Sequence, residues 1–170
     1  MGKKCLDSFF LVIGYYPRSL YNLFIMKNIV VFLVVFIILG GNVKAQTKHF
    51  IGEKFGGGIV FQVSTNGLHG LISETIDQGS CTGDNAAKIA KNGIHSMAGK
   101  AFNDWRLPTK EELNKLYLKK KIIGGFMDWD YWSSSSGGTD IMWTQSFYDG
   151  SKAHLYTWAI EGNVRAVRIF

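Results

Sequence analysis

The sequence predicts an α+β fold in a single domain that begins near Gln46. The prediction rests on a β-hairpin near the start of this region, two helical segments in its middle and several alternating strands toward its end. Runs of strands and helices that stay separate favour α+β over a regular strand–helix alternation. The chain has 170 residues, of which 46% are apolar and 19% charged, a globular composition.

The hairpin is predicted by an Asn-Gly pair between two β-rich runs. Residues 59–63 read Ile-Val-Phe-Gln-Val, and a second apolar run follows His69. Asn66-Gly67 between such runs is typical of a hairpin turn. The glycines at 56–58 precede a strand and lack phosphate-loop spacing, so they do not indicate a nucleotide site.

Two helices are expected next. Residues 84–102 indicate a helix interrupted near Asn92-Gly93. In the second helix, Thr109 and Glu112 have the spacing of a capping box, which marks a helix N-terminus. We expect that helix to run through the lysines at 119–121 and to end at Gly124-Gly125.

Strands follow the helices. Apolar and polar residues alternate over residues 141–147 and again over 153–158, with a turn between them. Residues 163–170 are expected to form one short terminal strand. The prediction is therefore two helices with short antiparallel strands.

Residues 26–45 have the order of a secretory signal peptide. Lys27 precedes an unbroken apolar run of 11 residues, 29–39, and a small-residue cleavage site ends at Ala45. Residues 1–25 fit poorly before such a signal, so we interpret them as an upstream extension and Met26 as the start. The protein is then secreted or periplasmic.

Membrane anchoring through residues 29–41 is the alternative localisation. As a helix, the apolar run would span about 16 Å, roughly half of a bilayer core. An uncleaved signal segment is the only membrane contact that the sequence suggests.

The positive charge belongs mostly to the leader. The net charge is +6, but residues 1–45 hold five basic side chains and one acidic one, whereas residues 46–170 hold 14 basic and 12 acidic ones. A nucleic-acid footprint should lie on the folded domain. The distribution therefore argues against a nucleic-acid partner.

The domain has a single cysteine. Cys5 lies in the leader and Cys81 in the domain, so no intrachain disulfide is available there. The sequence places no base beside Cys81, as a catalytic thiol would require. We expect a small buried or loop residue.

Six short motifs in residues 51–170 match one known pattern in the same order. They are Gly-Gly-Ile-Val-Phe at 57–61, Asn-Gly-Leu-His-Gly-Leu at 66–71, Asp-Trp-Arg-Leu-Pro-Thr-Lys-Glu-Glu-Leu at 104–113, Tyr-Trp-Ser-Ser-Ser at 131–135, Trp-x-x-x-Phe-x-x-Gly at 143–150 and Val-Arg-Ala-Val-Arg at 164–168. The chain thus resembles the C-terminal domain family of the bacterial collagen-like adhesin Lcl.

This resemblance implies a C-type-lectin-like fold over residues 46–170, distantly similar to formylglycine-generating enzymes. It also implies binding of sulfated glycans, as in the adhesin. The chain lacks the collagen-like repeat, and formylglycine generation needs two active-site thiols, so no catalytic residues are expected. Arg106, Arg165 and Arg168 lie within the family motifs and are expected to pair internally with carboxylates.

Aromatic residues are the main candidates for ligand binding, because aromatic faces stack on sugar rings. We expect His154, Tyr156 and Trp158 to share one strand face, opposite Ala153, Leu155 and Thr157. Trp129 is a further candidate. Core packing is the competing interpretation for the aromatic residues, including Tyr131, Trp132 and Trp143.

Charged residues supply weaker candidates. Lys119, Lys120 and Lys121 could contact an anionic glycan, although lysines are also favourable at a helix C-terminus. Asp128, Asp130 and Asp140 could bind calcium or remain solvated loop carboxylates. His49, His69, His95 and His154 lack zinc-ligand spacing, so no metal or other cofactor is predicted.

The sequence therefore predicts an exported, non-catalytic binding module that recognises a glycan or a surface protein. The first alternative is a structural domain of a surface assembly without a small ligand. An enzyme related to formylglycine generators is the third hypothesis, which the thiol count disfavours.

Overall fold

The structure is a computed structural model that describes residues 25–31 and 46–170. The chain divides after Ala45, so the region from Gln46 onward is described by itself. Of the predicted extension and signal peptide, residues 25–31 are helical and the rest lies outside the described residues. Within the two described ranges, no helix combines the length and the apolar character needed to cross a bilayer.

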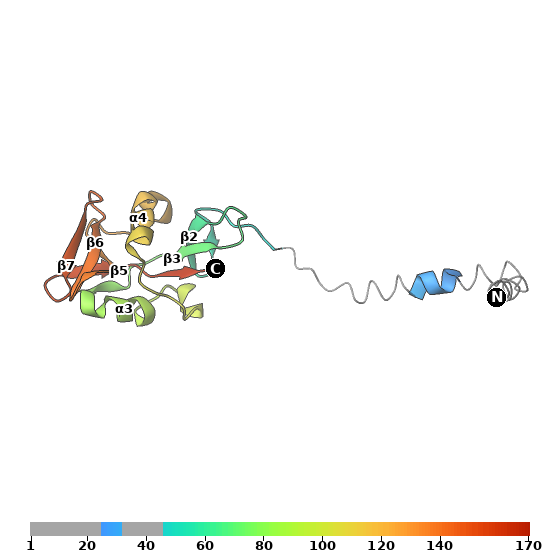
Figure 1. The fold of residues 1–170 in the computed structure, drawn as a ribbon, viewed down its shortest axis with the longest axis horizontal. Helices are drawn as coiled ribbons and strands as arrows, with labels where there is room; N and C mark the ends of the chain where they lie inside the picture. The colour runs from blue at the N-terminus through green and yellow to red at the C-terminus, as the bar shows by residue number, and fades with distance from the viewer. Residues whose placement is uncertain (1–24, 32–45) are drawn as a thin grey trace, which may run out of the picture. The chain divides into compact units, whose positions relative to one another are not determined.

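Residues 46–170 form an α+β domain, as predicted (Figure 1). Its strands are β1 (Lys54–Phe55), β2 (Gly58–Val63), β3 (Gly70–Ser73), β4 (Gly79–Thr82), β5 (Asp130–Gly138), β6 (Ile141–Ser146), β7 (Lys152–Tyr156), β8 (Glu161–Val164) and β9 (Val167–Ile169). Its helices are α3 (Gly83–Asn92), the 3-10 turn η2 (Gly99–Ala101), α4 (Lys110–Leu118) and α5 (Lys120–Ile123).

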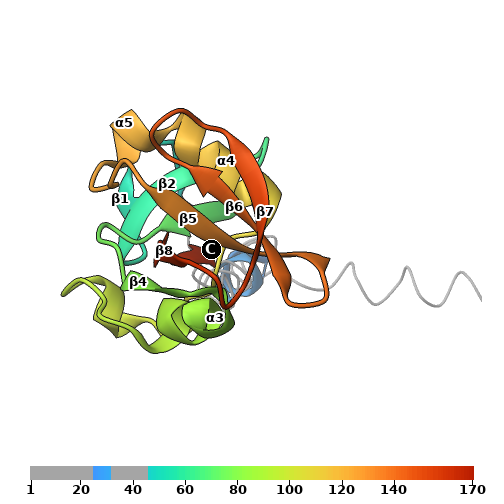
Figure 2. The ribbon, with the colours of Figure 1, turned by 90° about the vertical axis from the view of Figure 1, so that its left-hand side faces the viewer.

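The strands form two sheets. The first has the order β1-β2-β3-β9, and the second has the order β4-β8-β5-β6-β7. Figures 1 and 2 show α4 and α3 on opposite sides of the domain. The prediction of antiparallel strands fails at one place: β8 runs parallel to β5, with Tyr131 opposite Asn163. The segment after β7 returns across the second sheet before β8 begins, so β8 takes the direction of β5.

The hairpin and the helix cap are confirmed. Strands β2 and β3 pair antiparallel, and the Gly67 N–H donates to the Ser64 carbonyl across the turn (2.9 Å). Thr109 and Glu112 form the capping box: the Glu112 N–H donates to the Thr109 hydroxyl, and the Thr109 N–H donates to the Glu112 carboxylate.

The second helix is shorter than predicted. It ends at Leu118, because Lys119 leaves helical geometry at φ −113° and ψ 12°. The short α5 follows and ends at Gly124, whose φ of 76° favours glycine. With α5 and η2 added, residues 46–170 hold four helical segments instead of the predicted two. The predicted interruption near Gly93 is confirmed, since α3 stops at Asn92.

The predicted terminal strand is wrong as a single element. It divides into β8 in the second sheet and β9 in the first. Between them lie Arg165 and Ala166, both fully buried. The chain changes sheets here because the Arg165 guanidinium pairs with Asp77 (2.8 Å), and the Ala166 carbonyl accepts from the Glu74 N–H (3.0 Å).

The core consists of two apolar clusters on either side of β5. Adjacent residues of that strand point to opposite sides: Trp132 packs in one cluster with Trp105 and Cys81, and Tyr131 packs in the other with Phe147. Both aromatic residues of β5 are fully buried. Of the two expectations for Cys81, a buried residue or a loop residue, the first is confirmed: Cys81 is buried in β4.

Candidate functional site

Three of the predicted aromatic candidates are more than half exposed near the second sheet, as is Tyr148 in the turn after β6. Trp129 is 61%, Tyr156 is 53% and Trp158 is 65% exposed. Core packing, the competing interpretation, holds for the fully buried Tyr131 and Trp132. The surface of the domain thus carries three of the predicted aromatic candidates.

Tyr156 and Trp158 form a tilted aromatic pair, named below the Tyr156–Trp158 pair. Their ring centroids are 5.4 Å apart with 31° between the planes. The predicted common strand face is wrong for Trp158, because β7 ends at Tyr156. The buried Thr157 between them holds the turn: its N–H donates to the Asp140 carbonyl (2.8 Å), and its carbonyl accepts from the Gly83 N–H (2.7 Å).

His154 belongs to a different contact. It lies opposite Trp143 on β6, with ring centroids 5.2 Å apart, and the Lys110 ammonium is 3.8 Å from the Trp143 ring centre. The other face of β7 points inward, where Leu155 packs against the core. His154 therefore contacts Trp143 whereas Tyr156 contacts Trp158, although His154 and Tyr156 share the exposed face of β7.

Trp129 lines a surface groove of about 590 Å³. The other lining residues are Ser80, Met127, Asp128, Ile160, Glu161 and Asn163. An aromatic wall beside a few polar groups is the usual composition of a ligand groove. We refer to it below as the Trp129 groove.

The loop before Trp129 is anchored by Arg165. The guanidinium donates to the carbonyls of Gly124 (3.3 Å) and Gly125. It also lies 3.9 Å from the Phe126 ring centre and pairs with Asp77. Because Arg165 is fully buried, these contacts exclude water and hold the loop backbone in one geometry.

Tyr131 also holds the loop before Trp129 in place. Its hydroxyl donates to Asp77 (2.6 Å) and accepts from the Met127 N–H (2.8 Å). Burial, and next the hydrogen bond to Asp77, raise the pKa of Tyr131 far above its usual value. The hydroxyl therefore stays protonated, and the backbone two residues before Trp129 is fixed.

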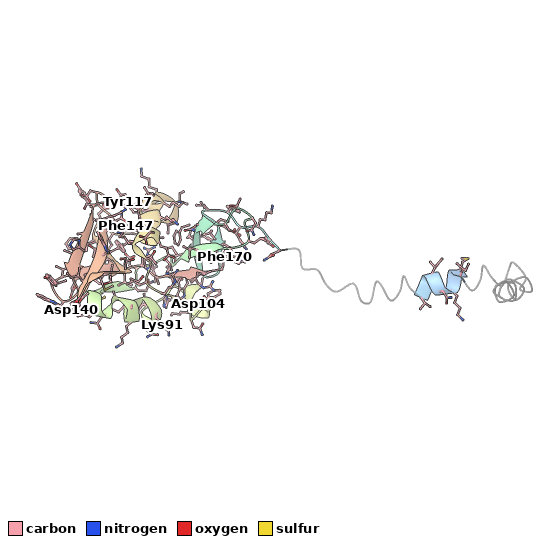
Figure 3. The ribbon with its side chains drawn as sticks, in the orientation of Figure 1. Lys91, Asp104, Tyr117, Asp140, Phe147 and Phe170 are labelled. Carbon is pink, nitrogen blue, oxygen red and sulfur yellow. The ribbon has the colours of Figure 1, made fainter. Side chains whose placement is uncertain are left out.

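The Trp129 groove and the Tyr156–Trp158 pair lie toward opposite ends of β6. Trp129 bonds through its carbonyl to the Phe147 N–H, whereas Thr157 bonds to Asp140. Figure 3 labels Phe147 and Asp140, which flank the two ends of this strand. Ile160 connects the two features through the chain. It lines the Trp129 groove, and it follows Trp158 by two residues, so the two Cα atoms are at most about 7 Å apart.

The three lysines do not converge into a free basic patch. The Lys120 ammonium donates to the Phe147 carbonyl, lies 3.7 Å from Asp128 and sits 5.0 Å from the Tyr117 ring centre. Lys119 is half-buried, and Lys121 alone of the three is exposed. The structure thus gives Lys120 internal partners.

The carboxylates considered for calcium are dispersed. Asp128 lines the groove, and Asp140 lies at the hairpin between β5 and β6. Burial, and next the nearby Asp149, raise the pKa of Asp130. Over residues 25–31 and 46–170, no three His, Cys, Asp or Glu side chains gather closely enough to hold a metal ion.

Cys81 lacks the setting of a nucleophile. Burial, and next the negative charge of Glu161, raise the pKa of its thiol. A reactive cysteine requires the opposite shift.

The predicted internal pairing of the motif arginines is confirmed. Arg106 pairs with Glu112 (2.7 Å), Arg165 with Asp77 (2.8 Å) and Arg168 with Asp104 (2.7 Å). The hydrogen bond from Arg106 contributes to holding the pKa of Glu112 below its usual value, against the opposing effect of burial. These arginines therefore hold the fold together.

In comparisons with known proteins, no protein-family model matches the chain, and no curated protein sequence matches it significantly. Sequence reasoning missed the groove residues Met127, Ile160, Glu161 and Asn163. They come from segments far apart in the chain, and no local pattern marks them.

Proposed function

We propose that residues 46–170 form an exported, non-catalytic binding module that recognises a glycan. We place this module in the C-type-lectin-like class, as a relative of the Lcl C-terminal domains. The observation that carries this proposal is the exposure of Trp129, Tyr156 and Trp158 on anchored backbone. Exposed aromatic rings that cost little ordering entropy are efficient binding groups. The raised pKa of Cys81 supports the non-catalytic part.

The test is a glycan array probed with the purified protein, repeated with Trp158→Ala. Loss of one stacked ring should weaken binding by about 1–3 kcal/mol. Phe50→Ala is the matched control, because Phe50 is equally exposed at 66% but precedes β1 in the other sheet. Failure to bind any glycan, or equal loss with both variants, contradicts the proposal.

The salt dependence of binding distinguishes a ligand held by aromatic stacking from one held by charge. Screening shortens from about 10 Å at 0.1 M to about 3 Å at 1 M. Binding through the aromatic rings should survive this change. Binding that collapses would instead point to lysines such as Lys121.

The open edge of β7 favours the second candidate, an interaction domain without a small ligand. Ser146 N–H donates to Ser151 and Thr157 N–H donates to Asp140, so by alternation the backbone groups of Lys152 and His154 face away from β6. Such an edge can accept another strand. Self-association in sedimentation experiments that His154→Pro abolishes, together with an empty array, would support this candidate.

Export itself is part of the proposal. N-terminal sequencing of the protein outside the cytoplasm should start at Gln46. Recovery of a species beginning at Met1 or Met26 in the membrane fraction would favour anchoring through residues 29–41.

A further inference from the structure

We infer that the Trp129 groove takes an uncharged sugar ring and disfavours a sulfated one. The inference rests on the proposed glycan binding and adds the class of ligand. It differs from the sulfated glycans that the resemblance implies, because it follows from the groove's own charges.

The charged side chains that line the groove are both acidic. Asp128 and Glu161 are the only ionisable side chains among the lining residues, and both are exposed to solvent. A sulfate placed against this lining would meet like charge.

Lys120, which pairs with Asp128, does not reverse this preference. Lys120 lies 3.7 Å from Asp128, but its ammonium also donates to the Phe147 carbonyl. It is only 27% exposed at the side chain. Turning toward a sulfate would break both contacts, so Lys120 tempers the charge of Asp128 without offering an anion site.

The remaining chemistry suits a neutral ring. Trp129 supplies a flat apolar face, and the carboxylates of Asp128 and Glu161 accept hydrogen bonds from sugar hydroxyls. Met127 and Ile160 add apolar side chains to the lining. The anchoring of the loop by Arg165 and Tyr131 means that the groove needs little ordering on binding.

The test compares the same oligosaccharides with and without sulfate. An array presents galactose-, glucose- and N-acetylglucosamine-based chains in both forms to the purified protein at 0.1 M salt. We expect the neutral form of the best ligand to bind roughly tenfold more tightly than the sulfated form, as two nearby like charges predict. The difference should shrink at 1 M salt.

Three variants locate the effect. Trp129→Ala should abolish binding of the neutral ligand, and Phe50→Ala should leave it unchanged. Glu161→Gln keeps the shape of the side chain and should reduce discrimination against sulfate to about threefold or less, because it removes the carboxylate whose charge Lys120 does not temper.

The outcomes distinguish this inference from the proposed function. Tighter binding of the sulfated forms, or neutral binding that Trp129→Ala does not change, overturns the inference while glycan binding stands. An array with no bound glycan at all overturns both.

Discussion

Two segments of the domain expose aromatic side chains but are held in different ways. The loop of residues 124–130 carries Trp129 and is held by the buried Arg165 and Tyr131 and by the partly buried Asp77. The segment of residues 152–158 carries Tyr156 and Trp158 at a sheet edge, with the two backbone hydrogen bonds of Thr157 behind it. The first segment therefore depends on a charge network in the core, and the second on local backbone pairing.

The largest effect should come from Arg165→Met. It leaves the Asp77 carboxylate without its cation in a mostly buried site, which costs about 4 kcal/mol of unfolding free energy. Urea unfolding measures the loss. Arg168→Met is the matched control, because its partner Asp104 is 49% exposed, and an exposed pair should contribute about 1 kcal/mol or less. Equal losses would mean that burial does not distinguish the two pairs.

Loss of the helix cap should cause an intermediate loss of stability, and it should leave both aromatic segments unchanged. Thr109→Ala removes the acceptor of the Glu112 N–H, a 3.2 Å bond. We expect a loss of about 1 kcal/mol. An unchanged urea midpoint would contradict the role of this cap, whereas Thr109→Ser should retain most of the stability.

Removal of the exposed rings should barely change stability. Trp129→Ala and Trp158→Ala should each shift the unfolding free energy by less than about 0.5 kcal/mol, as for surface substitutions in general. Thermal melts of both variants check this. If Trp158→Ala unfolds the domain, Trp158 is a core residue and its assignment to the binding surface is wrong.

Reducing agent should have the smallest effect. Cys81 is the one cysteine of residues 46–170, so no intrachain bond is available to reduce there. The melting temperature should be the same with and without dithiothreitol. A marked decrease would reveal a disulfide between two copies.

The sequence predicted best what local chemistry decides. The turn at Asn66-Gly67, the capping box at Thr109 and the stop of α3 before Gly93 each depend on residues that are neighbours in the chain. The sequence also predicted that the motif arginines pair with carboxylates inside the domain. It did not predict their partners, since Asp77 and Arg165 are 88 residues apart.

The errors lie where distant segments meet. Residues 163–170 look like one strand, but the burial of Arg165 divides them between two sheets. Trp158 continues the alternation of β7 in sequence, yet Thr157 bonds to Gly83 and turns the chain away. The Trp129 groove is lined by Ser80, the 127–129 loop and β8, which are far apart in the chain. Its acidic lining therefore could not be predicted from the sequence.

The position of β8 bears on when the domain can fold during synthesis. This strand lies between β4 and β5, and β4 has no other neighbour in its sheet. The ribosome makes β8 and β9 after every other strand described above, so both sheets stay unfinished while most of the chain has already emerged. A nascent chain with such late, long-range pairing remains open. If the protein is exported as proposed, that delay leaves time for an unfolded chain to cross a translocation channel.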